Sequence, residues 1–461
     1  MLGFGLRLVA EILRSERLMR TYLFLLVYPG VLFLVTYAWK DWFPAVGGLV
    51  VLTAVFNHPE MPREVLGIRG LSLWNAMLLL TVPAWLAGRR REGLRWDLPP
   101  LAGVMLALYV LVMCMGFLRL ALAPGDLTLS TSQLVGEYLV DPLKFLVPAL
   151  MIFDGARTRP RFRLALASIL AVYVFLSILV LREVGLPRLA GGHSFNVLAL
   201  QAIEETGFHR NAVSVMLAGA SWALVCIRPL SGSRLRSAVL LAIAGFVVFA
   251  QALTGGRGGY LAWISVGLVL GLLRWRGALV LAPIAVAIVL AIVPDVRERA
   301  LYGIGSSEQD IESGPIDEEK LSSGRLKAWG YMVTKVGESP WVGFGRLGYQ
   351  RSGLYESLRT ETQDAFPHPH NAYLEWLLDN GWLGMAPLVV LYALVLVLSL
   401  ILFADARHPV FVVAGGVAVS LVLAQLVGGI SGRSCYPNEE TVGMWCAVGL
   451  MLRVWVERRG G

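Results

Sequence analysis

Long apolar runs separated by short polar breaks recur along almost the whole chain. Most of them approach the roughly 20 residues that an α-helix needs to cross the hydrocarbon core of a bilayer. Segments in lipid must be helical, because a backbone without water has to satisfy its own hydrogen bonds. The pattern therefore predicts an all-α, polytopic membrane bundle. Its expected spans are Tyr22–Trp39, Leu71–Leu86, Pro100–Leu122, Tyr138–Phe153, Leu164–Leu181, Ala212–Ile227, Ala238–Leu253, Tyr260–Leu273, Leu279–Val293, Gly384–Phe403, Val410–Ile430 and Thr441–Val456.

Arginines are concentrated in every second loop between these runs. The clusters stand at 89–95, 157–163, 228–236, 274–276 and 458–459. Because short loops rich in arginine stay in the cytoplasm, the clusters fix the orientation of each span. Counting back from the C-terminus predicts about 12 spans with both termini cytoplasmic, or about 13 if the short run Val46–Phe56 also crosses.

The composition agrees with a membrane protein. Hydrophobic residues make up 56% of the chain and charged residues 16%, against about 25% charged in soluble domains. The net charge of +8 follows from the loop arginines and requires no nucleic acid. Four cysteines without paired spacing favour neither a disulfide framework nor a zinc site. Residues 1–21 are amphipathic and lack a small-residue cleavage site, so we expect an interfacial helix there and no cleavable signal peptide.

One polar segment, residues 294–370, is far longer than the usual connection of about 4–6 residues. On the predicted orientation it lies outside the cytoplasm. Its sequence predicts a helix at Arg325–Val336 and two aromatic turns over Pro340–Gly345. The expected organisation is an amphipathic segment at 1–21, a transmembrane bundle at 22–293, an external loop at 294–370, and an active-site helix with the last spans at 371–461.

His370 lies where the external loop meets the next apolar run. Asn371 is a suitable N-cap for a helix that begins at Ala372, and Gly381 should break that helix before the span. A histidine at a helix start near the membrane surface can accept a proton near pH 7. The alternative is a hydrogen-bonded histidine that only fixes the loop.

Three arginines lie on the external side, where the positive-inside rule disfavours them. Arg210 directly precedes a span, Arg257 stands in a turn of four glycines, and Arg325 begins the predicted loop helix. Arginine binds phosphate through bidentate contacts, and glycine lets a ligand or another backbone approach closely. With His370, the three favour a diphosphate held at the outer leaflet. In the alternative, each pairs with an acid of the loop, namely Glu308, Asp310, Glu312, Asp317, Glu318 or Glu319.

Lys144 is an ionisable residue inside an apolar run, which makes it a functional candidate. Asp141 precedes it by three residues, so a local ion pair explains it at least as well. No carboxylate is spaced to complete a metal site with His368 and His370, and the glycines form no nucleotide-binding pattern. We therefore expect neither a metal nor a nucleotide cofactor.

These motifs resemble those of the bacterial O-antigen ligases and O-antigen polymerases. In that family a histidine followed by Asn, Ser or Gln is separated by nine residues from a Gly-x-x-Gly, and here the nine residues Ala372–Asn380 separate His370-Asn371 from Gly381-Trp382-Leu383-Gly384. The turn Thr254–Leu261 fits the family's arginine motif. The segment Ser323–Trp329, followed by Pro340, Gly343 and Gly345, is similar to the family's loop.

The resemblance implies a GT-C-like membrane glycosyltransferase of the bacterial inner membrane, with one long periplasmic loop and no metal or other cofactor. The donor would be an O-antigen glycan on undecaprenyl diphosphate, and the acceptor a sugar hydroxyl of lipid A–core, both embedded among membrane lipids. His370 would act as general base for an inverting attack. Arg210, Arg257 and Arg325 would hold the diphosphate, while Asn371 and Lys144 are further substrate-binding candidates.

Other functions fit the same motifs. An O-antigen or exopolysaccharide polymerase would use a second lipid-linked glycan as acceptor, and an O-linked protein glycosylation ligase would use serine or threonine. A transporter of lipid-linked glycans is the alternative of a different class, since a bundle of about 12 spans is also a common transporter plan. Against a transporter, the spans contain few charges and the two halves show no repeat.

Overall fold

The regular elements of the computed structural model are helices, apart from an isolated bridge between Val65 and Ile68, over the residues that it describes. These residues are 27–59, 61–62, 64–65, 67–68, 70–125, 127–184, 203–204, 206–277, 279, 325–362, 368–432 and 434–460. The helices are α3 (Tyr28–Tyr37), α4 (Phe43–Leu52), α5 (Leu73–Arg91), α6 (Pro100–Leu122), α7 (Thr131–Val135), α8 (Asp141–Lys144), α9 (Val147–Gly155), α10 (Arg159–Val184), α13 (Arg210–Cys226), α14 (Arg234–Thr254), α15 (Arg257–Arg274), α19 (Arg325–Val336), α20 (Gly348–Arg351), α21 (Leu354–Thr362), α22 (Ala372–Ala404), α23 (Pro409–Gly429) and α24 (Val442–Gly460), with single turns η2 (Thr53–Val55), η3 (Gly136–Val140), η4 (Arg228–Leu230) and η5 (Glu439–Thr441).

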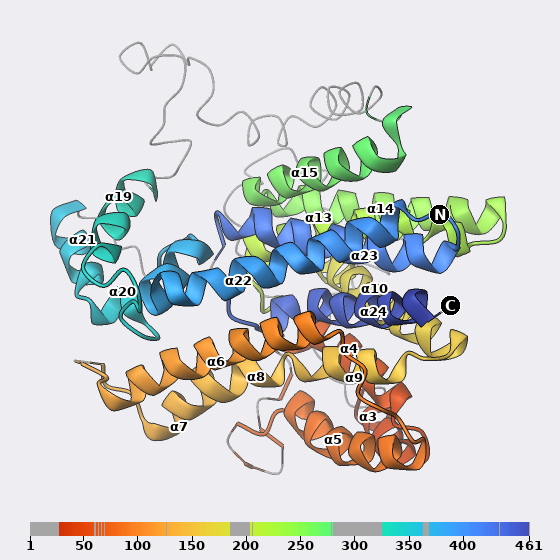
Figure 1. The fold of residues 1–461 in the computed structure, drawn as a ribbon, viewed down its shortest axis with the longest axis horizontal. Helices are drawn as coiled ribbons and strands as arrows, with labels where there is room; N and C mark the ends of the chain where they lie inside the picture. The colour runs from red at the N-terminus through yellow and green to blue at the C-terminus, as the bar shows by residue number, and fades with distance from the viewer. Residues whose placement is uncertain are drawn as a thin grey trace, which may run out of the picture.

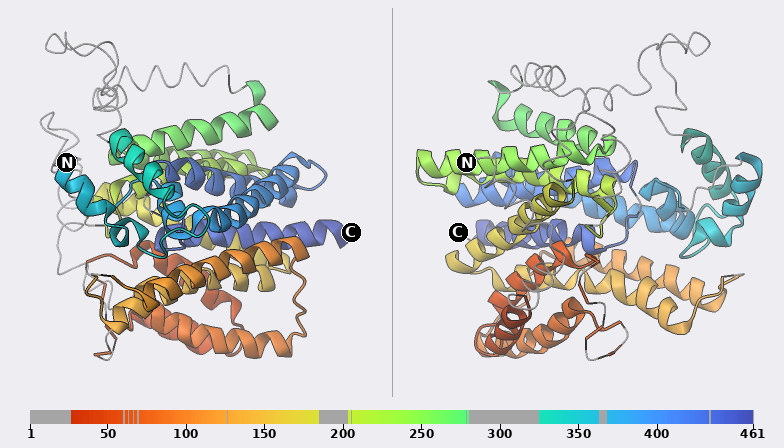
Figure 2. Two further views of the ribbon diagram at one scale, coloured as in Figure 1. Left: turned by 60° about the vertical axis from the view of Figure 1, so that its left-hand side comes forward. Right: turned by 180° about the vertical axis from the view of Figure 1, so that it is seen from behind.

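The long helices lie side by side along one axis, while α19, α20 and α21 gather at one end of the bundle (Figure 1). Helix α23 lies inside the bundle and packs against α13, α15, α22 and α24. Both views in Figure 2 place the short helices beside the start of α22. We call this end, with the beginnings of α13, α15 and α22, the site end. The opposite end, with the loops at 89–97, 155–159, 228–234 and 404–409, is the basic end.

Six helices in the described part of the chain are long and apolar enough to cross a membrane. They are Pro100–Leu122, Arg159–Val184, Arg210–Leu230, Arg234–Thr254, Ala372–Ala404 and Pro409–Gly429. Each contains or largely overlaps a predicted span, which confirms a multi-pass helical membrane protein. The total of about 12 spans is not confirmed. Predicted spans at Leu71–Leu86, Tyr260–Leu273 and Thr441–Val456 correspond to helices α5, α15 and α24, which are not among the six.

Two expectations lie outside the described residues: the N-terminal amphipathic helix and the span Leu279–Val293. The predicted span Tyr138–Phe153 is helical but is not one uninterrupted helix. This segment consists of a π-helical turn, the short helix α8 and the helix α9, with a turn at 145–146. Pro142 and Pro148 begin the two short helices, because proline lacks the N–H that an uninterrupted helix would need there.

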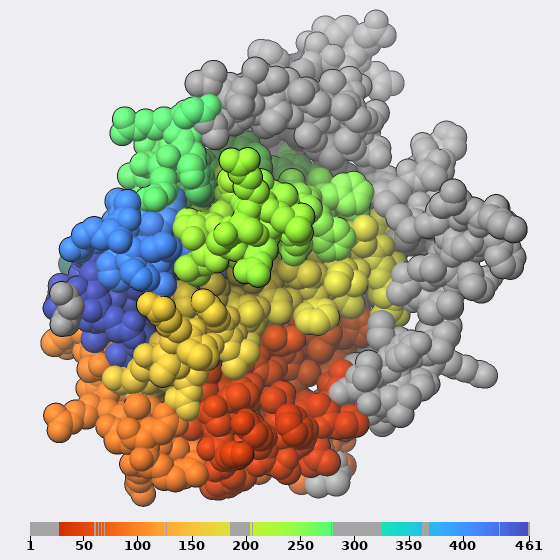
Figure 3. Space-filling model, turned by 90° about the vertical axis from the view of Figure 1, so that its right-hand side faces the viewer, coloured from red at the N-terminus to blue at the C-terminus, as the bar shows by residue number. Residues whose placement is uncertain are grey.

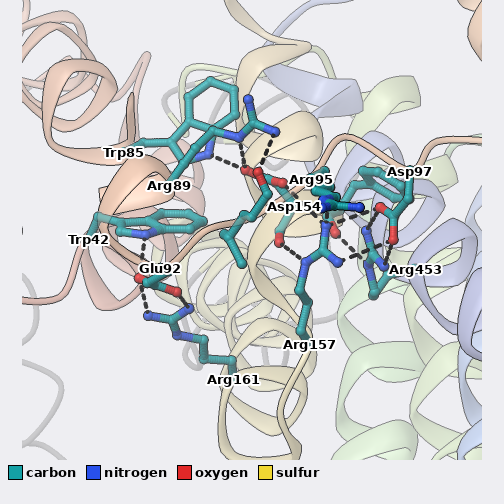
Figure 4. Close-up of polar contacts among 12 residues, drawn as sticks. Trp42, Trp85, Arg89, Glu92, Arg95, Asp97, Asp154, Arg157, Arg161 and Arg453 are labelled. Atoms are coloured by element: carbon teal, nitrogen blue, oxygen red, sulfur yellow. Dashed lines mark hydrogen bonds and ion pairs between the residues drawn. The ribbon is translucent and has the colours of Figure 1, made fainter. Parts of the chain in front are cut away.

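The basic end is held together by ion pairs between loops that are distant in sequence (Figure 4). The buried Asp154 carboxylate accepts from Arg89 at 2.6 Å and from the Trp85 indole at 2.9 Å. Asp97 receives both Arg157 and Arg453, the latter from the last helix. In Figure 3, which views this end, segments from nearly the whole described chain meet on one face. The arginine-rich loops therefore also join the helices at this end.

Helix α22 is broken at Gly381, as the sequence predicts. This residue has φ 60° and ψ −168° inside an otherwise helical run. Residues 340–345 of the long polar segment fill the break: the Trp382 and Leu383 amides donate to the carbonyls of Pro340 and Trp341, at 2.8 and 3.0 Å. The break thus anchors the loop to the bundle just below the predicted site.

Candidate functional site

The turn that carries His370 is strained and capped. His370 has φ 51°, a left-handed conformation that costs a residue with a side chain about 1–3 kcal/mol. The next residue, Asn371, caps α22, since its side-chain oxygen accepts from the amides of Tyr373 and Leu374 at 3.0 and 3.1 Å. The predicted N-cap and helix start at Ala372 are therefore confirmed. By capping α22, Asn371 fixes the position of the His370 imidazole at the start of this helix.

Helix α19 holds this turn from the loop side. It spans Arg325–Val336, the range predicted from sequence. The Trp329 indole donates to the carbonyl oxygen of Pro369 at 3.2 Å, directly before the histidine. The rings of His368 and His370 lie 4.0 Å apart between centroids. Because Arg325 is one helical turn before Trp329, the contact brings the start of α19 to the His370 turn.

The three predicted arginines share one structural position: each is the first residue of its helix. Arg210 begins α13, Arg257 begins α15 and Arg325 begins α19, and none of these helices has an acid in its first turn. Helix N-termini already carry a positive partial charge, so a cation there is the reverse of the usual preference. The pKa of Arg325 is lowered, first by burial and then by the charges of Arg257 and Arg210. The structure brings the three together.

Small residues allow the starts of α13 and α15 to approach each other closely. Gly255 ends α14 in a left-handed conformation, and the Ser214 hydroxyl donates to the carbonyl of Gly256 at 3.0 Å. A Cβ on Gly259 would lie 2.0 Å from the Ser214 oxygen. The sequence offered two reasons for the glycines of this turn, close approach of a ligand or of another backbone. The structure shows the second, because α13 packs against the turn.

A small cavity of about 30 Å³ lies beside His370, large enough for about one water molecule. Its walls come from the start of α13, the end of α23 and the loop that follows. The lining residues are His209, Asn211, Ala212, Val215, His370, Gln425, Gly428, Gly429, Ser431, Gly432, Ser434 and Glu440. His370 and the residues flanking Arg210 therefore share one space.

A buried polar cluster below this cavity was missed by the sequence analysis. Arg346 lies 3.2 Å from Asp379 and 3.4 Å from Glu375, and its guanidinium stands 3.4 Å from the centroid of the Tyr436 ring. Burial disfavours the charge, but Tyr436 and the two carboxylates outweigh it and raise the pKa of Arg346. A sequence signal existed: Glu375 and Asp379 are four residues apart on an apolar helix and need a partner there.

Lys144 is not part of this cluster. Its ammonium lies 2.6 Å from Asp141, as the ion-pair alternative predicted, and it packs over the rings of Phe56, Trp74 and Phe145. It lines a separate, larger cavity. The acids of the external loop that could pair with the arginines lie outside the described residues. Within the ranges that the structure describes, no group of three His, Cys, Asp or Glu residues could hold a metal ion.

The comparisons with known proteins add one assignment. Residues 240–389 match a family described as O-antigen ligase. The matched segment contains Arg257, Arg325 and His370, while Arg210 and Lys144 precede it. A search of curated proteins finds no match. The match supports the resemblance to O-antigen ligases, over residues 240–389 of the chain.

Proposed function

We propose that the chain transfers an O-antigen glycan from undecaprenyl diphosphate to a sugar hydroxyl of lipid A–core, at the periplasmic face of the inner membrane. The observation that carries the proposal is the convergence of Arg210, Arg257 and Arg325, each at a helix start, around the turn of His370. The family assignment supports the general class of reaction, and the chemistry of the site supports its parts.

The arginine cluster suits the diphosphate of the donor. Three guanidinium groups and three helix N-termini each contribute positive charge here, and the first turns of the three helices contain no acid. Guanidinium groups also offer paired donors that match phosphate oxygens. Donors organised in advance around a leaving group contribute about 3–4 kcal/mol each to its stabilisation in the transition state.

His370 would be the base. Its imidazole removes the proton from the acceptor hydroxyl while the hydroxyl oxygen forms a bond to the anomeric carbon. The bond between that carbon and the diphosphate breaks on the opposite side, so the configuration inverts. The electron pair leaves on the diphosphate, where the arginines neutralise it. A positioned base typically contributes about 10²–10⁴-fold in rate.

The lipopolysaccharide of cells that lack the chain tests this function. A ligase defect leaves polymerised O-antigen on undecaprenyl diphosphate, and the lipid A–core carries no O-antigen. Single repeat units attached to the core would instead show a polymerase, the alternative within the same family. Lipopolysaccharide without O-antigen, together with donor that accumulates on the cytoplasmic leaflet, would favour the transporter.

The proposed sidedness has its own test. Thr360, in α21 at the site end, and Arg90, at the basic end, are both exposed. A membrane-impermeant thiol reagent applied to spheroplasts should label Thr360→Cys directly and Arg90→Cys only after permeabilisation, with the wild type as background for its own cysteines. The reverse labelling would place the arginine cluster on the cytoplasmic side and contradict the proposal.

A further inference from the structure

A second cavity, of about 980 Å³, lies between the starts of α5 and α7 and helix α8. This volume is at the upper end of the range found for small-molecule sites, about 300–1,000 Å³. It is lined by the side chains of Asn57, Asn75, Ser132, Gln133, Glu137 and Asp141, among others. The reaction steps proposed for His370 and the arginines make no use of it.

The lining suits a hydroxyl-rich ligand. Amides, serine hydroxyls and carboxylates exchange hydrogen bonds with sugar hydroxyls in both directions. The side-chain oxygen of Asn75 is buried and accepts no hydrogen bond from any residue in the described ranges. A buried acceptor without a donor destabilises the folded protein, and a ligand hydroxyl that donates to it would remove that cost.

The charge of the lining argues against a second diphosphate site. Asp141 pairs with Lys144 at 2.6 Å, which neutralises the cation, and Glu137 adds a further carboxylate. Carboxylates in the lining of this cavity would repel a phosphate group, whereas the arginine cluster would attract it. The two cavities therefore favour different parts of the reacting pair: the diphosphate at the arginines and an uncharged saccharide in the larger cavity.

A thin wall separates the larger cavity from the one beside His370. Asn57 lines the larger cavity and donates to the carboxylate of Glu439, whose neighbour Glu440 lines the smaller one. Gly207 packs against the backbone of Asn57, and His209, two residues on, again lines the smaller cavity. The larger cavity thus lies one layer of residues away from the His370 side, and a saccharide bound in it has to extend past that layer to bring its hydroxyl to the imidazole.

We propose that the larger cavity binds the saccharide of the acceptor, an assignment that rests on the proposed function and adds its second substrate site. Lys144 then contributes to the binding of the saccharide, because it lines this cavity, and does not contact the diphosphate.

Gly136 provides the test, because it lines the cavity and a Cβ built on it meets no atom within 4 Å. Gly136→Phe should place a ring inside the cavity and reduce the space for a saccharide without disturbing the helix, while Gly136→Ala leaves that space nearly unchanged. Gly245→Phe on the exposed face of α14 is the matched control, since a Cβ there also meets nothing within 4 Å. The purified chain in nanodiscs is titrated with a phosphate-free core oligosaccharide and, separately, with inorganic diphosphate.

The proposal predicts that Gly136→Phe weakens oligosaccharide binding at least about tenfold, or about 1.4 kcal/mol, and leaves diphosphate binding unchanged. Gly136→Ala and Gly245→Phe should bind both probes as the wild type does. Equal oligosaccharide binding by Gly136→Phe would overturn the proposal. The proposal would also be overturned if transfer depended on His370 but the KM for the acceptor were the same in Gly136→Phe as in the wild type. In that case the proposed function would stand and only the assignment of the larger cavity would fail. Oligosaccharide binding that Gly136→Phe abolishes, in a chain that transfers no glycan, would support the cavity and contradict the proposed function.

Discussion

His370 combines an unfavourable backbone with the proposed chemistry, and the two can be separated. Its φ of 51° suits glycine better than histidine. We expect His370→Gly to keep or raise thermal stability, because the strain is released, while transfer falls by about 10²–10⁴-fold with the loss of the base. Transfer is measured with lipid-linked donor and lipid A–core, and stability by thermal unfolding in detergent.

Leu347 is the matched control, since it is the other non-glycine residue with a positive φ, 62°, in the described part of the chain. Leu347→Gly should release similar strain and retain transfer. If His370→Gly kept full activity, the histidine would only fix the loop, which is the alternative considered from the sequence.

Arg257 tests the role of the guanidinium shape. Lysine keeps the charge but loses the paired donors, so Arg257→Lys should lower kcat/KM for the donor by about 10²-fold. Arg274, at the other end of the same helix α15, donates to the carbonyl of Phe403 at the basic end. Arg274→Lys should leave the donor kinetics unchanged. Equal losses in both variants would mean that the change acts through helix α15 and not through the diphosphate.

At the scale of single elements, the sequence predicted helices well where one apolar run continues without proline. The bounds of α6 and α19 agree with the predicted Pro100–Leu122 and Arg325–Val336. Residues 138–153 form a helical segment that is interrupted, because Pro142 and Pro148 each favour the first turn of a new helix. The contact of Trp329 with the His370 turn was not predictable, because it joins two segments whose spacing the sequence does not encode.

The break of α22 is the element on which the site end depends. Gly381 has φ 60°, and a Cβ on it would lie 2.4 Å from the carbonyl carbon of Trp341. Gly381→Ala should therefore destabilise the protein by about 2–4 kcal/mol, through backbone strain and overpacking. We expect a fall in the melting temperature and a loss of transfer together.

Gly330 in α19 supplies the control for that substitution. It is helical, and a Cβ there meets nothing within 4 Å, so Gly330→Ala should be neutral or stabilise by up to about 1 kcal/mol. A melting temperature of Gly381→Ala equal to that of the wild type would show that the loop segment 340–345 does not need this break.

At the scale of the whole molecule, the site end and the basic end lie at opposite ends of the bundle and differ in composition. Sequence predicted this division, because arginines in alternate loops and the isolated Arg257 and Arg325 stand on opposite sides. It could not predict the buried cluster of Arg346, Glu375 and Asp379, nor the larger cavity, since both are formed by segments far apart in the chain. Such features arise only when the helices pack.

The basic end should give the protein a specific dependence of stability on pH. The hydrogen bond from Arg453, with smaller effects of its charge and of Arg157, lowers the pKa of Asp97 from 3.8 to about 2, against an opposing effect of burial. A carboxyl with a lowered folded-state pKa adds stability that is complete above its unfolded pKa and is lost as the pH falls through the folded one. The contribution of Asp97 should thus be constant above about pH 5 and disappear between about pH 4 and 2.

Melting temperatures of Asp97→Asn should be lower than wild type at neutral pH and converge with it near pH 2. Because both changes break the same pair, Asp97→Asn should cost less in an Arg453→Met background than alone. A constant difference between the two curves down to pH 2 would mean that Asp97 acts through packing and not through its charge.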